Sequence, residues 1–287
     1  TGITEGARAF TAELTDAGGN TGTSVTNTIT KDVTAPALAL NAAADVAIAN
    51  LATYSLSGTC DESGATVNLN FGGLANTANC DGANFNLAVW DVTAEADNAT
   101  VAITADITDA AGNPATQATD SVLKDTLAPT LAIVTPADAS VIGIAADSAT
   151  YTVSGTCDEN TQTVIIKIDA VAATSPVGFV CDGTNFTGTI DTTGLGDAVF
   201  AFTAELSDSI GNVGTSATNN VTKDTALPTV ALTTPADAGY INVATDSATF
   251  TVSGTCNEGA QTVVIKVDGV AAASPVGFVC DGTNFTG

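Results

Sequence analysis

The chain has 287 residues, more than the roughly 100 that one β-sandwich domain needs. Six Lys and Arg residues against 31 Asp and Glu residues give a net charge of −25, which argues against nucleic acid and anionic membrane surfaces as partners because both would repel the chain. The hydrophobic fraction of 45% is enough for packed cores, so the composition also argues against global disorder.

Three short segments recur along the chain and reveal an internal repeat. They are a Lys-Asp segment that ends in Pro, a Ser-Gly-Thr segment that ends in Glu, and a turn that runs from Asp to Gly-Asn. The first occupies residues 31–36, 124–129 and 223–228, the second 57–62, 154–159 and 253–258, and the third 15–20, 108–113 and 207–212. Equivalent residues Cys60, Cys157 and Cys256 are 97 and 99 residues apart, which sets the length of the repeat.

The repeats are out of phase with the ends of the sequence. The first residues resemble 193–224, the back of a repeat, and the last ones resemble 126–188, the front of a repeat. We therefore predict two whole repeats between two complementary partial ones. The predicted segments are 1–32 (partial), 33–125 (whole), 126–224 (whole) and 225–287 (partial).

Within a whole repeat the side chains alternate with the period of two that a strand with one buried face requires. Val164, Ile166 and Ile168, for example, alternate with Ile165 and Lys167. Seven strands are expected, near residues 131–135, 149–156, 163–169, 177–181, 185–190, 198–206 and 213–222. The predicted fold class is all-β, a tandem array of seven-stranded immunoglobulin-like β-sandwiches of about 97 residues each.

The recurring segments resemble those of a known family, the bacterial immunoglobulin-like repeats of large surface proteins and adhesins. The resemblance covers the whole chain and implies a repeat array at the cell surface, in which calcium at the junctions stiffens the rod. It is carried by the Asp-x-x-x-Pro linker, the Ser-Gly-Thr-x-x-Glu segment and the Asp-x-x-Gly-Asn turn, the linker being Asp32/Pro36, Asp125/Pro129 and Asp224/Pro228.

Each repeat holds one pair of cysteines, and the expected strand order brings both members to the same end of the sandwich. We therefore predict three disulfides, Cys60–Cys80, Cys157–Cys181 and Cys256–Cys280. Disulfides imply an oxidising, extracellular location. The rival interpretation is a zinc site, which two Cys without a His or a Cys-x-x-Cys spacing do not support.

Acidic residues are expected to gather at one end of each repeat, facing the preceding one. The start of the first strand, the second-to-third loop and the sixth-to-seventh loop share that end, and each carries acids. Clustered carboxylates repel one another unless a cation bridges them, and Ca²⁺ takes six to eight oxygen ligands. The candidate junction calcium ligands are Asp32, Glu62, Asp109, Asp125, Glu159, Asp208, Asp224 and Glu258. The alternative is that these residues only shape turns, in which Asp and Asn are common.

No enzyme signature is present in the sequence. It has no His, no nucleophile elbow and no phosphate loop, and its prominent acids recur in every repeat, as scaffold residues do. We therefore expect a structural, non-catalytic protein. The leading interpretation is a rod or stalk in which each repeat contacts only its neighbours.

Two other functions remain open at this point. The first is a subunit of an extracellular filament or sheath, in which residues 1–32 of one chain supply strands to residues 225–287 of an identical chain. The second is a module that binds glycans or ice, which the aromatic content of 5% argues against. No apolar run approaches the roughly 20 residues of a membrane-spanning helix, and we expect any export signal to lie outside this sequence.

Overall fold

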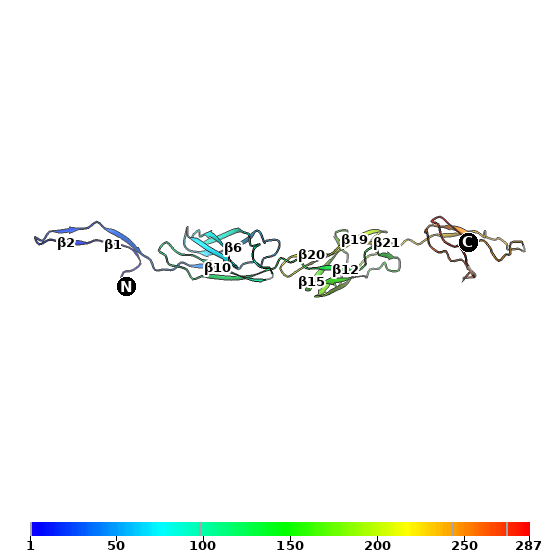
Figure 1. The fold of residues 1–287 in the computed structure, drawn as a ribbon, viewed down its shortest axis with the longest axis horizontal. Coiled ribbons are helices and arrows are strands. Elements are labelled where there is room, and N and C mark those ends of the chain that lie inside the picture. Colours follow the sequence, from blue (N-terminus) through cyan, green and yellow to red (C-terminus); the bar gives the residue numbers. More distant parts are fainter. Residues whose placement is uncertain (1, 98, 243, 274) are drawn as a thin grey trace. The chain divides into compact units, whose positions relative to one another are not determined.

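The computed structural model describes residues 2–97, 99–242, 244–273 and 275–287, and these are built of strands and turns (Figure 1). None of the described residues forms a helix long and apolar enough to cross a membrane. The chain divides into two compact units, each described by itself. Unit 1 comprises residues 1–138, 152–191 and 201–220, and unit 2 comprises residues 139–151, 192–200 and 221–287.

The first part of unit 1 is a pair of two-stranded ribbons with exposed apolar side chains. β1 pairs with β4, and β2 pairs with β3, both antiparallel. Phe10, Leu14 and Ile29 are exposed there, because two strands alone offer no second layer to cover them. The bounds are β1 (Gly6–Phe10), β2 (Glu13–Thr15), β3 (Thr21–Thr23) and β4 (Asn27–Lys31).

Residues 33–125, also in unit 1, form a sandwich of two sheets. One sheet has the order β5-β6-β9 and the other β11-β10-β7-β8, giving the seven strands expected. The all-β fold predicted from the sequence is confirmed. The bounds are β5 (Leu38–Leu40), β6 (Tyr54–Cys60), β7 (Thr66–Phe71), β8 (Leu74–Asn79), β9 (Asn84–Trp90), β10 (Ala99–Asp106) and β11 (Ala118–Lys124).

The core of this sandwich lies between its two sheets and is drawn from both. Tyr54 of β6 meets Phe71 of β7 edge-on with ring centroids 5.2 Å apart, and Phe71 meets Trp90 of β9 at 5.9 Å. Val67 and Ile103 are fully buried beside these rings. Trp90 is thus a core residue.

Residues 126–224 repeat this architecture with additional short strands. One sheet has the order β12-β14-β18 and the other β13-β21-β19-β15-β16, with β17 paired to β15 and β20 to β19. The bounds are β12 (Leu131–Thr135), β13 (Val141–Gly143), β14 (Tyr151–Cys157), β15 (Asn160–Ile168), β16 (Val171–Ala172), β17 (Val180–Asp182), β18 (Asn185–Ile190), β19 (Ala198–Ser207), β20 (Val213–Thr215) and β21 (Asn219–Asp224).

The last part of unit 2 contains a three-stranded sheet in the order β22-β23-β26 and a β24-β25 hairpin. Its apolar side chains Val230 and Leu232 are exposed, whereas their counterparts in the preceding repeat, Leu131 and Ile133, are half-buried and buried. The bounds are β22 (Val230–Thr234), β23 (Ser253–Cys256), β24 (Lys266–Val267), β25 (Val270–Ala271) and β26 (Asn284–Thr286).

The Gly of the recurring Ser-Gly-Thr segment is required by close packing on both sides of a strand. A Cβ at Gly155 of β14 would lie 2.0 Å from the carbonyl oxygen of Ala132 and 2.5 Å from the ring of Phe186. The same clash is found at Gly58 and Gly254. The segment therefore recurs because the central strand of the smaller sheet admits no side chain at this position.

Candidate functional site

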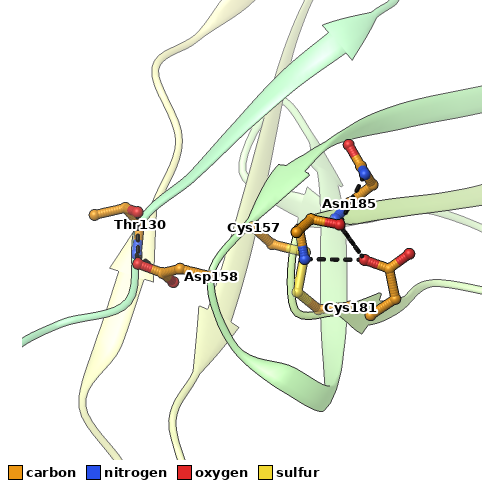
Figure 2. Close-up of a disulfide and its surroundings, with 7 residues drawn as sticks. Thr130, Cys157, Asp158, Cys181 and Asn185 are labelled. Atoms are coloured by element: carbon orange, nitrogen blue, oxygen red, sulfur yellow. Dashed lines mark hydrogen bonds between the residues drawn. A yellow bond between two sulfur atoms is a disulfide. The ribbon is translucent and has the colours of Figure 1, made fainter.

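The boundary between sequence repeats is where most of the recurring polar residues meet, and it is the candidate functional site. Each repeat closes a disulfide near this end: Cys60–Cys80, Cys157–Cys181 and Cys256–Cys280, with Cα atoms 6.0 to 6.1 Å apart. Figure 2 shows the second of these, with Cys157 at the end of β14 and Cys181 in β17. The disulfide fixes the loop that carries the acidic residues after Cys157.

The acid that follows the first cysteine binds the backbone at the start of the first strand. Asp158 accepts hydrogen bonds from the backbone nitrogen of Thr130 at 2.9 Å and from its hydroxyl at 2.6 Å (Figure 2). Asp61 accepts one from the Ala37 nitrogen at 2.8 Å. In the third copy Asn257 stands in place of the Asp, and its Oδ1 accepts a hydrogen bond from the Thr229 nitrogen at 2.7 Å. The change from Asp to Asn therefore preserves this hydrogen bond.

The linker lysine is buried, which the sequence analysis did not anticipate. Lys223 is 3% exposed, and its Nζ donates to the carbonyl oxygens of Thr192 at 2.9 Å and Leu195 at 2.7 Å. It also pairs with Asp147 at 2.9 Å, and its hydrogen bond holds the pKa of that carboxyl below the usual range. The available signal was the Lys that precedes the linker Asp in every copy.

The other linker lysines have the same role. Lys124 is also 3% exposed, donates to the carbonyl oxygen of Glu95 at 2.9 Å and lies 3.8 Å from Asp97. Lys31 donates to the carbonyl oxygen of Ile3 at 2.6 Å. Each lysine thus ties the last strand of its repeat to a loop of the same repeat, so the linker leaves from a fixed point.

The linker aspartates, predicted as calcium ligands, shape the turn into the next repeat. Asp125 accepts a hydrogen bond from the Leu127 nitrogen at 3.0 Å through Oδ1. In the same way Asp32 accepts a hydrogen bond from the Thr34 nitrogen, and Asp224 accepts one from the Ala226 nitrogen, each at 3.1 Å. The linker prolines Pro36 and Pro129 are buried, so the chain is held on both sides of this turn.

The Asp-x-x-Gly-Asn turn is closed by its own side chains. Asp208 Oδ1 accepts hydrogen bonds from three backbone nitrogens, among them Gly211 at 2.7 Å and Asn212 at 2.9 Å. Burial acts to raise the pKa of Asp208, but its hydrogen bonds with Asn212 and the backbone outweigh burial and hold the pKa below the usual value. Gly211 has a φ of 99°, a conformation that favours glycine.

The Asn of this turn also contacts the preceding repeat. Asn212 Nδ2 donates to the carbonyl oxygen of Asp125 at 2.8 Å, and its Oδ1 accepts from the backbone nitrogen of Ile48 at 2.8 Å. At the boundary before it, Asn113 Nδ2 lies 3.3 Å from the carbonyl oxygen of Asp32. The recurring turn is therefore part of the boundary between repeats.

Glu159 is the boundary carboxylate with a raised pKa. Burial raises its pKa, and the negative charges of Asp158, Asp208 and Asp125 add to the effect. Glu159 thus lies within electrostatic reach of Asp125 and Asp208, two of the candidate ligands grouped with it by the sequence analysis, and of Asp158. Their oxygens suit Ca²⁺ chemically. Among the described residues, however, no three carboxylates, His or Cys lie close enough together to hold a metal ion.

The fold and these boundaries define the chain as an array of β-sandwich repeats. No protein-family model and no curated protein sequence matches it. Among solved structures it is similar to a Ca²⁺-stabilized adhesin that helps an Antarctic bacterium reach out and bind ice, with 24% identity, 98% of this chain and 73% of that one covered, and a TM-score of 0.41.

Two further structures show comparable similarity. One is a 1.5-MDa bacterial ice-binding adhesin, with 21% identity, 78% of this chain and 76% of that one covered, and a TM-score of 0.39. The other is a tetra-tandem repeat in the extending region of a large adhesion protein, with 20% identity, 99% and 73% covered, and a TM-score of 0.32. At these values the similarities carry no argument about function, which rests on the boundary contacts.

Proposed function

We propose that the chain is a structural, non-catalytic rod or stalk segment of a large extracellular or cell-surface protein of the adhesin type, built of bacterial immunoglobulin-like repeats. The observation that carries this proposal is the recurring linker. Lys124 and Lys223 are buried in the repeats that they leave, the linker Asp caps the turn in every copy, and Pro36 and Pro129 are buried in the next repeat. A chain held in this way keeps its repeats apart, and its length grows with their number.

The location and partners follow from the same features. Three disulfides fit an oxidising compartment outside the cytoplasm. The partners are neighbouring repeats of the same protein, which the linker contacts directly. The recurring carboxylates Asp158 and Asp208 accept hydrogen bonds from backbone and side-chain groups, which is a role in turn formation and not in acid–base chemistry.

Calcium at the junctions is a further part of this proposal, with Asp125 and Glu159 as the first ligands to test. The support is the position of Glu159, where burial first raises its pKa and the negative charges of Asp158, Asp208 and Asp125 raise it further. A bound Ca²⁺ would supply positive charge there. Substituting Glu159 by Gln should then weaken calcium binding, measured by titration calorimetry of the full chain.

Small-angle X-ray scattering of the chain tests the rod. Three sandwich lengths of about 35–40 Å each give a rod of roughly 110 Å, for which the radius of gyration is about 32 Å. A compact protein of 287 residues would have a radius of gyration of about 19 Å. The larger value is expected in calcium, and a value near that of a compact protein would refute the rod.

A second candidate function is a self-assembling extracellular filament of identical chains. It is favoured by an open groove of about 880 Å³ in unit 2, lined by apolar side chains that include Val230, Leu232, Val264, Ile265 and Phe285. Residues 1–32 repeat the sequence of 193–224, which contains β19 and β21 of the whole repeat's larger sheet. The same segment of a second chain would fit this groove by strand addition.

Light scattering coupled to gel filtration separates the two candidates. The filament predicts that chain 1–287 associates with rising concentration and that a variant without residues 1–32 stays monomeric. Monomers of both variants over the same range would exclude strand addition between chains and leave the rod.

A further inference from the structure

Asn212 is a buried amide whose hydrogen bonds extend into two sequence repeats. Its side chain is 2% exposed. Within its own repeat, Nδ2 donates to Asp208 Oδ2 at 2.6 Å. Across the boundary, Nδ2 donates to the carbonyl oxygen of Asp125 at 2.8 Å and Oδ1 accepts from the Ile48 nitrogen at 2.8 Å. The amide therefore has a partner for each of its two donor hydrogens and for its oxygen.

The two groups that Asn212 contacts in the preceding repeat are held by one short ladder. Val46 N donates to the Leu123 carbonyl oxygen at 2.8 Å, and Asp125 N donates to the Val46 carbonyl oxygen at 2.9 Å. Ile48 follows in a turn closed by the bond from the Ala47 nitrogen to Asn50 Oδ1 at 2.9 Å. The acceptor at Asp125 and the donor at Ile48 thus move together as one rigid element.

Asn212 is itself oriented before it meets that element. Asp208 binds both the backbone nitrogen of Asn212 and its side-chain Nδ2, so little side-chain freedom remains to be lost at the boundary. Behind it, a Cβ at Gly214 would lie 1.8 Å from the carbonyl oxygen of Pro129, so the linker packs directly against the next strand. Two preorganised surfaces therefore meet through the amide of Asn212.

The other copies of the turn form a graded series. Asn113 makes the equivalent bond to Asp109 at 2.7 Å and only a long contact of 3.3 Å to the carbonyl oxygen of Asp32. Asn20 is exposed and bonds Asp16 at 2.9 Å, and no linker precedes it in this sequence. Closure of the turn is common to all three copies, whereas the bonds across the boundary are complete only at Asn212.

We propose that the Asp-x-x-Gly-Asn turn is a hydrogen-bond latch between consecutive repeats, with Asn212 as its positioning residue, and that the latch holds the boundary without a metal ion. The inference rests on the proposed rod for its biological purpose. It is an alternative to calcium as the source of stiffness, because it assigns to a neutral amide the stiffening that calcium would otherwise have to supply.

Distances between spin labels on the full chain test the latch. Labels are introduced as noncanonical amino acids at the exposed positions Val89 and Ile165, which leaves the disulfides intact. The distance distribution is measured with calcium and with a chelator for the unsubstituted chain and for Asn212→Ala. Asn20→Ala is the matched control, because it removes the same bond within the turn and none at the Ile48 boundary.

A second variant removes the latch from the other side. Ile48→Pro deletes the donor nitrogen, and position two of the turn Ala47–Asn50 is one that Pro favours, so the turn itself is retained. In Asn212→Ala, hydrogen exchange of the Ile48 amide should accelerate roughly tenfold, as expected for the loss of one hydrogen bond. Combining the two substitutions should broaden the distance distribution no more than Asn212→Ala alone, since that substitution already removes the bond to Ile48.

The latch predicts a narrow distribution that the chelator leaves unchanged, that Asn212→Ala and Ile48→Pro broaden, and that Asn20→Ala does not. A narrow distribution in every variant would refute the latch and leave the rod. Broadening of the unsubstituted chain by the chelator would also refute the latch, because calcium would then hold the boundary. A distribution already broad in calcium without substitution would refute both the latch and the rod.

Discussion

Pulling the chain from its two ends should reveal a hidden length in each whole repeat that only a reducing agent releases. Cys157 and Cys181 are 24 residues apart, and the bond between them removes that loop from the path of the force. At about 3.3–3.6 Å per residue the loop is roughly 84 Å long, and subtracting the 6.1 Å already spanned by the Cα atoms leaves about 78 Å. For Cys60 and Cys80, 20 residues apart, the same estimate gives about 64 Å.

Because the disulfide sulfurs are buried, a repeat must unfold before its disulfide can be reduced. Cys157 is 6% exposed and Cys181 is fully buried, so a thiol reaches the bond only after the repeat has unfolded. Single-molecule force spectroscopy in dithiothreitol should therefore show an unfolding step followed, after a delay that shortens with thiol concentration, by a second step of about 78 Å or 64 Å. Without thiol, the second steps should be absent.

Paired substitutions assign these steps. Replacing Cys157 and Cys181 by Ala should merge one step of about 78 Å into unfolding. The step of about 64 Å from Cys60 and Cys80 should stay in place, as should the step of about 78 Å from Cys256 and Cys280, which are also 24 residues apart. The same substitution should lower the free energy of unfolding by about 3 kcal/mol, since a loop of 24 residues is no longer closed in the unfolded chain. If the second steps came before unfolding, or if the total extension of the chain were equal with and without thiol, the disulfides would not be the source of the hidden length.

Three further predictions concern single residues, each measured by denaturant unfolding of the full chain. Lys223→Met should cost about 1–3 kcal/mol because it removes the donor to the carbonyl oxygens of Thr192 and Leu195, and no measurable loss of stability would contradict this role of the lysine. Gly155→Ala should cost about 1–3 kcal/mol or more, because its Cβ would meet the carbonyl oxygen of Ala132. Glu159→Gln should stabilise the calcium-free chain at pH 7, and the gain should vanish at acidic pH. The raised pKa of Glu159 means that the unsubstituted chain loses stability as pH rises through that pKa, so a gain that grew at low pH would refute this assignment.

The strands could be predicted from the sequence where a side-chain alternation sets one buried face. In β15, Val164, Ile166 and Ile168 are buried as expected. The short strands β13 (Val141–Gly143) and β16 (Val171–Ala172) were not predicted, because two or three residues carry no period. β13 is set by its parallel pairing with β21, a tertiary contact that local pattern does not encode.

The calcium role that the sequence analysis gives to the boundary acids stays a prediction. The sequence grouped Asp125, Glu159 and Asp208 at one boundary, and the electrostatic coupling around Glu159 agrees with that grouping. It assigned them to calcium, whereas Asp125 and Asp208 accept hydrogen bonds from backbone nitrogens. The buried Lys223 was overlooked because a lysine beside a linker is ordinarily solvated.

The hydrogen bonds of other acids show a second use of negative charge in this chain. Asp81, Asp182 and Asp281 occupy one recurring turn, and bonds from backbone nitrogens lower the pKa of each carboxyl. A carboxylate bonded in this way is stabilised in its charged form by neutral donors, so it needs no cation. Much of the acidity of the chain is therefore used to close turns. Glu159 is the exception among the acids with a resolved shift, since its pKa is raised, and any cation that the boundary binds should be sought there first.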